Sequence, residues 1–155
     1  MDRKDVSSWL SGPKETLEQQ GIDFGYPGQR LGFPETGVGS LSRPGRRLVA
    51  LTFDWFAALF IANAIGAGMT QNMRSWLVLE IFFIEILVLT ALVGASFGQQ
   101  IMGIGVRALD GGRLNVLGVI LRTLLLVIVI PAVIYDRDGR GLHDKAVGGV
   151  VQRIR

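Results

Sequence analysis

The sequence predicts an all-α membrane protein with two transmembrane helices, a third membrane segment that is shorter or re-entrant, and a small strand-like cytoplasmic element. Hydrophobic residues make up 49% of the 155 positions and charged residues only 19%, and the mean hydropathy is positive. These values favour an integral membrane protein over a soluble domain. Two predominantly apolar runs are long enough to cross a bilayer, and a third run is divided by an arginine.

The N-terminal segment, residues 1–42, is polar and rich in glycine and proline. We expect a flexible cytoplasmic tail, because such a composition buries too little apolar surface to fold alone. A short helix is predicted over residues 13–20, with proline at its start and glycine after its end. The first residues, MDRKDVSSWLSGPKE, contain no apolar stretch of the signal-peptide kind, so no cleavable leader is predicted. Residues 43–155 are expected to form the transmembrane domain.

The first predicted span covers about residues 47–65. After Arg47, only Thr52, Asp54 and Asn63 are polar in it. A soluble core helix rarely needs so much apolar sequence, so the run predicts a membrane helix. Asp54 is then unusual, because an acid within a span is costly and faces protein or a wet cavity.

The second predicted span covers about residues 76–97 and contains Glu80 and Glu85. The short link at residues 66–75 makes the two spans antiparallel neighbours. Glu80 lies near the predicted outer end of the span, where its carboxylate can reach water. Glu85 lies deeper, so it is the better candidate for a partner among the buried charged groups.

The third apolar segment covers residues 114–135 and is divided by Arg122. The pattern before Arg122 is amphipathic, which suits a helix that lies in the membrane interface. A helix over residues 123–135 would be about 20 Å long, whereas the hydrocarbon core is about 30 Å thick. The length therefore favours a segment that re-enters over one that spans.

Two short stretches, residues 104–109 and 148–154, alternate in the manner of β-strands. The first leads into Asp110-Gly-Gly, which is a strong turn signal. If the two stretches pair, both lie on one side of the membrane. They are the strand-like element of the predicted fold.

Basic residues predict the orientation of the chain. Arg43, Arg46 and Arg47 precede the first span, whereas the link between the spans contains only Arg74. The positive-inside rule therefore places the N-terminus in the cytoplasm of a multi-pass plasma-membrane protein. Three straight spans would export the basic C-terminal tail, residues 136–155, whereas a re-entrant third segment keeps that tail inside.

The candidate site begins with Arg47 and Asp54, which are seven residues apart and differ by only about 20° in direction around a helix. Arg47 would lie at the cytoplasmic mouth, and Asp54 would lie deeper. The face that they share also contains Ala50, Leu51, Ala58 and Ile61. Two interpretations stay open. Asp54 is an ion or proton site entered past Arg47, or it is an acid that pairs with a base such as Arg122 for assembly.

Three further residues complete the candidate site. Glu85 is deep enough in the second span to meet Asp54 or Arg122. His143 and Asp144 follow the third apolar segment, and a histidine titrates close to neutral pH. The simplest expectation for this pair is a polar turn in which Asp144 caps a short helix.

Several functional classes are excluded by what the chain lacks. It has no cysteine, so no disulfide and no cysteine-based metal site can form. Its single histidine has no second cluster of metal ligands beside it. The chain has neither a nucleophile-elbow motif nor a phosphate-binding glycine loop, and no basic cluster lies near stacking aromatics. The sequence therefore predicts no enzyme activity, no metal or other cofactor, and no nucleic-acid partner.

These residues resemble the RDD family of small prokaryotic membrane proteins, in particular its short actinobacterial type. Arg47 and Asp54 match an arginine at the start of the first span and an aspartate seven residues later, and Asp144 matches a second aspartate. Further family positions match in order between them: Gly98, Gly103, Val106, Asp110, Gly111 and Arg122. The resemblance covers about residues 30–152. The Gln99-Gln100 pair departs from it, because the family often has basic residues there.

The resemblance implies a role in ion or proton transport, such as cation/proton exchange. Because two or three spans make a small transporter, we expect a homo-oligomer in the lipid bilayer. Asp54 would bind the cation or proton, and Arg47 and Asp144 would form a cytoplasmic gate. The alternative is a non-transporting membrane adaptor or assembly protein in which the arginines and aspartates are structural.

Overall fold

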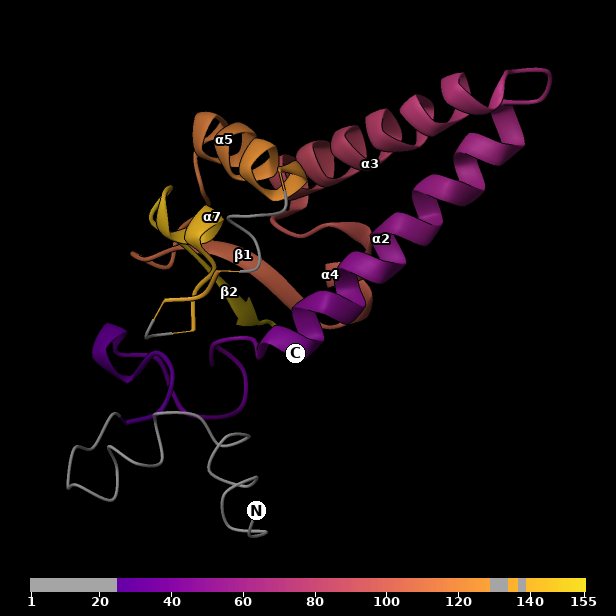
Figure 1. The fold of residues 1–155 in the computed structure, drawn as a ribbon. Helices are drawn as coiled ribbons and strands as arrows, with labels where there is room; N and C mark the ends of the chain where they lie inside the picture. Colours follow the sequence, from indigo (N-terminus) through magenta and orange to yellow (C-terminus); the bar gives the residue numbers. More distant parts are fainter. Residues whose placement is uncertain (1–24, 129–133, 137–138) are drawn as a thin grey trace, which may run out of the picture.

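The computed structural model describes residues 25–128, 134–136 and 139–155 (Figure 1). Most of the predicted tail, including the helix expected over residues 13–20, lies outside the described residues, as does Pro131 near the end of the third apolar run. In chain order the elements are η1 (Gln29–Leu31), α2 (Pro44–Ile65), α3 (Gln71–Val93), α4 (Phe97–Ile101), β1 (Ile104–Ala108), α5 (Val116–Val127), α7 (Leu142–Lys145) and β2 (Gly149–Arg153).

Two long helices, α2 and α3, form an antiparallel hairpin (Figure 1). Pro44 begins α2, where its missing N–H group removes no helical hydrogen bond. The hydroxyl of Thr70 caps α3 by accepting a hydrogen bond from the Met73 backbone N–H at 3.4 Å. Both helices are long and apolar enough to cross a membrane, and only 22% of each apolar window is buried. The exposed faces are therefore apolar, as lipid requires, and the two predicted spans are present as helices.

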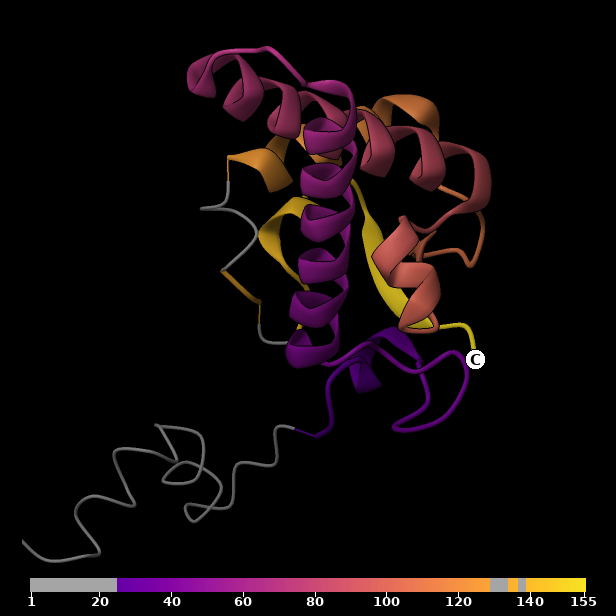
Figure 2. The same ribbon diagram turned by 90° about the vertical axis from the view of Figure 1, so that its right-hand side faces the viewer.

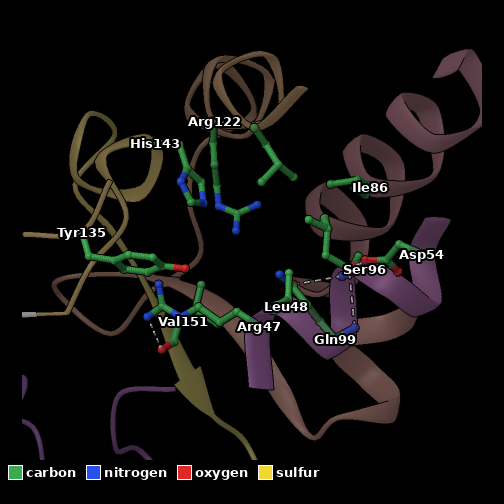
Figure 3. A pocket seen from close by; sticks show the side chains of 12 residues that line it. Arg47, Leu48, Asp54, Ile86, Ser96, Gln99, Arg122, Tyr135, His143 and Val151 are labelled. Carbon is green, nitrogen blue, oxygen red and sulfur yellow. Dashed lines mark hydrogen bonds between the residues drawn. The ribbon is translucent and has the colours of Figure 1, made fainter. Parts of the chain in front are cut away.

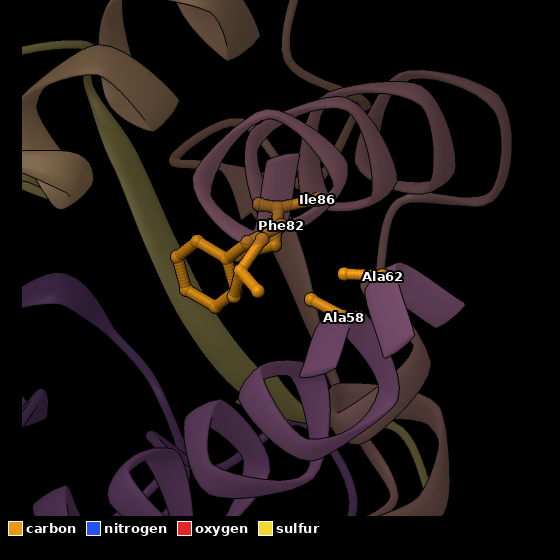
Figure 4. Packing of buried hydrophobic residues seen from close by; sticks show 5 residues of the cluster. Ala58, Ala62, Phe82 and Ile86 are labelled. Carbon is orange, nitrogen blue, oxygen red and sulfur yellow. The ribbon is translucent and has the colours of Figure 1, made fainter. Parts of the chain in front are cut away.

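The hairpin is held together by small side chains on α2 and large ones on α3. Ala58 and Ala62 face Phe82 and Ile86 across the interface (Figure 4). The Trp55 ring also meets that of Phe82 edge to face, with 5.4 Å between centroids. Alanines let the second helix come close, because their side chains are small.

One residue of the predicted α2 face, Ile61, does not lie in the buried row of the helix. Ile61 is 42% exposed, whereas Ala62 is fully buried, and the buried positions of α2 are Ala50, Asp54, Ala58 and Ala62. The contact with α3 follows the row of residues four apart, which is inclined to the helix axis. A row of residues seven apart runs almost straight along the helix, so it leaves this interface before Ile61.

The second apolar run breaks before its predicted end. Helix α3 ends at Val93, because Gly94 adopts a left-handed conformation with φ of 82°. Ser96 then opens α4 with a capping box, in which its side chain and that of Gln99 each bond the other's backbone N–H. Residues 94–97, assigned to the span by their apolar character, therefore form a turn and a new helix start.

The predicted strand pairing is confirmed. Strands β1 and β2 form an antiparallel two-stranded sheet in which Val106 lies opposite Val151. The backbone before α2 continues this sheet, because Arg153 donates its N–H to the Ser40 carbonyl at 2.9 Å. Figures 1 and 2 show this N-terminal segment beside the sheet, at the first end of α2, far from the turn that joins α2 to α3. The fold is mostly helical with a small sheet.

Helix α5 is too short to cross a bilayer, because 12 residues rise about 18 Å. It packs against α3 and α7. Leu114, just before α5, packs on the sheet residues Ile104, Val106 and Val151. After α5, the carbonyl of Ile134 accepts a hydrogen bond from the Leu142 N–H at 2.9 Å, beside α7. The chain on both sides of α5 therefore lies at the sheet end of the molecule.

Candidate functional site

A cavity of about 220 Å³ lies where α2, α4, α5, α7 and β2 meet (Figure 3). Its polar lining residues come from elements far apart in the sequence: Arg47, Asp54, Ser96, Gln99, Arg122, Tyr135 and His143. Its volume is well above the roughly 10–15 Å³ that one water requires. The predicted common face of Arg47 and Asp54 is thus one wall of a partly open cavity.

Asp144 is the centre of the charged network beside this cavity. Its carboxylate is completely buried and accepts a hydrogen bond from Arg122 Nε at 2.7 Å and another from Arg47 Nη1 at 3.1 Å. His143 Nε2 lies 3.4 Å from the same carboxylate. Burial raises the pKa of Asp144, but the charges of Arg122, His143 and Arg47 outweigh burial and leave the pKa below its ordinary value. Asp144 therefore stays ionised and joins α2, α5 and α7.

Arg47 links this network to the backbone of the sheet end. Its Nε donates to the Ser42 carbonyl at 3.1 Å, and its Nη2 donates to the Val151 carbonyl at 3.4 Å. The guanidinium can do this because its donors form a planar fork that reaches several acceptors at once. Arg47 thus connects the start of α2 with β2 and with Asp144.

Asp54 is held by the start of α4. Its Oδ2 accepts a hydrogen bond from the Ser96 hydroxyl at 2.7 Å, and its Oδ1 accepts one from the Gly98 N–H. Only glycine fits at position 98, because a Cβ there would collide with the Ala50 carbonyl. Asp54 is 2% exposed, and both of its oxygens are therefore satisfied within the protein.

Glu85 lies outside the cavity lining, and its charge interacts with that of Asp54, one of the two groups that it was predicted to meet. Its Oε1 accepts a hydrogen bond from the Phe97 N–H at 2.7 Å. Asp54 and Glu85 therefore receive the first N–H groups of α4 side by side, rather than pairing with an arginine. Glu80 is exposed on α3, as its place near the end of the span predicts.

The structure differs from one of the two open interpretations of Asp54 and from the predicted role of Asp144 as a helix cap. Arg122 forms its ion pair with Asp144, and no ion pair between Arg122 and Asp54 exists among the described residues. Asp144 does not cap a helix, because α7 begins at Leu142 with Gly141 as its cap and Asp144 lies inside it. The packing of α7 against α5 and β2 brings Asp144 to Arg122, and the local sequence does not encode that contact.

Sequence reasoning missed Ser96 and Tyr135 as lining residues. A signal for Ser96 is present, because Ser96 and Gln99 have the spacing of a capping box after an apolar run. Tyr135 has no such signal, since it reaches the cavity only through the path of the chain after α5. Arg122 has a further property that sequence could not show. Its Nη1 is buried and, within the described residues, has no hydrogen-bond partner.

An apolar two-helix hairpin, joined at one end to a sheet and a buried charged network, defines a small membrane protein with an internal polar site. The chain belongs to the RDD family, because the RDD family model matches residues 41–148. This confirms the family resemblance, and the match includes Arg47, Asp54, Arg122 and Asp144. Searches of curated proteins and of solved structures found no match.

Proposed function

We propose that the protein transports ions across the plasma membrane and that Asp54 carries a proton during each cycle. The observation that carries this proposal is a buried carboxylate on a membrane helix that faces an internal cavity of about 220 Å³. Acids within a membrane span are costly and are typical of proton and ion pathways. Arg47 and Asp144, at the sheet end of the cavity, would form the cytoplasmic gate.

The hydrogen bonds of Asp54 suit a proton better than a metal cation. Both carboxylate oxygens already accept hydrogen bonds, and the guanidinium groups of Arg47 and Arg122 line the same cavity. A further cation would be repelled by those charges. A proton on Oδ2, in contrast, requires only that the Ser96 hydroxyl turn and accept, because a serine hydroxyl serves as donor or acceptor.

The proposed membrane arrangement has α2 and α3 as spans and α5 as a re-entrant segment. Both flanks of α5 lie at the sheet end, and Arg43 and Arg46 lie at the same end. By the positive-inside rule this end is cytoplasmic, which also places the N-terminus there.

We further propose that the protein works as a homo-oligomer. Beyond Asp54, toward the α2–α3 turn, the hairpin is filled by the apolar cluster of Ala58, Ala62, Val78, Phe82 and Ile86. A proton cannot cross this region without polar partners. Large apolar side chains on the outer faces of both helices, such as Phe60 and Trp76, are exposed and available to lipid or to a second copy. A path between copies would complete the route.

Proton flux into proteoliposomes with an internal pH-sensitive dye tests the proposal. We expect an imposed pH gradient to drive a dye response with the wild type, and the Asp54→Asn variant to respond no faster than protein-free vesicles. Glu80→Gln is the matched control, because it removes an exposed span carboxylate outside the cavity. Equal flux with wild type and Asp54→Asn would remove Asp54 from the mechanism.

A second candidate is the membrane adaptor whose charged residues are structural. It is supported by the bonds of Asp144 to both Arg47 and Arg122, which tie three elements together. Under this alternative, the same vesicles show no proton flux with well-folded wild type, while loss of Asp144 still lowers stability.

A further inference from the structure

We propose that the cavity binds a small monocarboxylate anion at Arg122 and, resting on the proposed function, that this anion moves together with the proton on Asp54. The carboxylate of the ligand would accept a hydrogen bond from Arg122 Nη1. Its short alkyl group would pack against the aliphatic part of the wall.

The first observation is the incomplete bonding of Arg122. This side chain is only 2% exposed, and its Nε donates to Asp144 at 2.7 Å. Its Nη1 is buried and has no hydrogen-bond partner among the residues that the structure describes. Figure 3 shows the guanidinium pointing into the cavity. A buried donor on a charged group is costly to leave unpaired, so the position is suited to an anionic acceptor from outside the chain.

The second observation is the charge balance around the cavity. With His143 neutral, the positive charges of Arg47 and Arg122 cancel the negative charges of Asp144 and an ionised Asp54. A proton on Asp54 leaves one net positive charge, which one monovalent anion neutralises. Proton and anion therefore favour each other's binding, as linkage requires.

The balance counts the groups that line the cavity, and two titratable groups act on it. An ionised Glu85 interacts with the charge of Asp54 and so favours a proton on Asp54. On α3, the Glu85 carboxylate is bonded to the Phe97 N–H and does not line the cavity. Tyr135 contributes a neutral phenol, and α4 presents only the uncharged Ser96 and Gln99. On α7, His143 lies against Asp144, so a proton on it would add to the attraction for an anion.

The third observation is the chemistry of the rest of the wall. Leu48, Leu51, Ile86, Leu126 and Val151 form it. A sulfate or phosphate dianion exceeds the single net charge, and a halide leaves these side chains facing water. A carboxylate with a short alkyl chain matches both parts of a cavity of about 220 Å³.

Titration calorimetry of sodium propionate into the full chain in nanodiscs tests binding, with sodium chloride at equal ionic strength as the blank. We expect saturable heat that is absent from the blank. Affinity should rise toward lower pH by up to about tenfold per unit, because one proton is taken up with each anion. Asp54→Asn, which mimics the protonated acid, should bind propionate without this pH dependence.

Leu126→Phe is the blocking variant, because it fills the cavity and leaves every charged group in place. Leu124→Phe is its matched control, since Leu124 is on the same helix, is 47% exposed and does not line the cavity. We expect propionate binding to be lost in the first and kept in the second. Unchanged affinity in a folded Leu126→Phe variant would overturn the inference.

The proteoliposome assay separates this inference from the proposed function. Proton flux without any propionate heat overturns the anion site and leaves the proton proposal standing. Saturable heat on propionate addition, together with a proton flux that propionate stimulates, supports both the anion site and the proton proposal. Propionate heat without proton flux supports the site and overturns joint movement with a proton.

Discussion

Asp144 has no exposed surface and two guanidinium partners, so loss of its charge leaves two buried positive charges without this negative partner. Asp144→Asn should destabilise the protein by about 3–5 kcal/mol, because breaking one side of a buried ion pair strands the other. The melting temperature of detergent-solubilised protein measures the effect. Asp110→Asn is the control, since Asp110 is exposed in a turn and surface changes stay within about 0.5 kcal/mol.

The same residue determines how stability depends on pH. A carboxylate whose pKa is lower in the folded state stabilises fully above its ordinary pKa of about 4, and this stabilisation is lost as pH falls toward the folded pKa. Above about pH 6, Asp144 should therefore contribute no pH dependence to the melting temperature. Below about pH 4, we expect the melting temperature to fall as Asp144 takes up a proton. In Asp144→Asn the acid-side fall should be smaller. An equal fall in both proteins would contradict the role of Asp144.

The charged residues could be predicted one at a time, but their partners could not. Arg47, Asp54 and Arg122 stand out because each is a charge inside apolar sequence. Which of them meet depends on α7, a four-residue helix whose local sequence indicates only a turn. Asp54 therefore receives hydroxyl and backbone donors, and Asp144 pairs with Arg122, which one of the two open interpretations had paired with Asp54.

At the scale of elements, α4 is pressed closely against α2. A Cβ at Gly98 would meet the Ala50 carbonyl and lie 2.9 Å from Asp54 Oδ1. Gly98→Ala should therefore destabilise by about 1–3 kcal/mol through overpacking, and it should disturb Asp54. Thermal unfolding in detergent checks the first effect, and the dye assay checks the second.

Gly45→Ala is the matched control for this close approach. Gly45 lies in the first turn of α2, and the space that an added methyl group would occupy there is open, so alanine should be neutral or slightly stabilising. Similar melting temperatures for the Gly98 and Gly45 variants would show that α4 can move away from α2.

Element existence was easier to predict than element ends. Length and composition were sufficient to predict the two long helices, and alternation was sufficient to predict that residues near β1 and β2 are strands. The end of α3 could not be predicted, because residues 94–97 are apolar enough to continue a span. Gly94 nevertheless takes a left-handed conformation and ends the helix. Ile61 was misplaced for a related reason, since the crossing of α2 with α3 selects the buried row.

At the scale of the whole molecule, the chain before α2 and strand β2 must lie on the same side of the membrane. Gly39 and Ser40 pair with the backbone of Arg153 at 2.8 and 2.9 Å. Cysteines at Thr36 and Arg155 should therefore react alike with a membrane-impermeant maleimide in sealed vesicles, whereas one at Gly68, in the α2–α3 turn, should show the opposite accessibility. The natural chain has no cysteine, so labelling has no background.

The cysteine experiment also decides the path of α5. With two spanning helices, equal labelling at positions 36 and 155 requires that α5 return to the side from which it started. Opposite labelling at those two positions would mean that α5 crosses the bilayer and that the sheet does not form in the membrane.

The late position of Asp144 in the chain has a consequence for biosynthesis. Arg47 and Arg122 are synthesised before Asp144, the carboxylate with which both form ion pairs. Strand β1 is likewise synthesised before its partner, β2. The hairpin of α2 and α3 can enter the bilayer while the ribosome is still adding residues, but the cavity closes only after the final strand is made. A nascent chain that stops before Asp144 therefore contains two arginines without this counter-charge and a strand β1 without its partner.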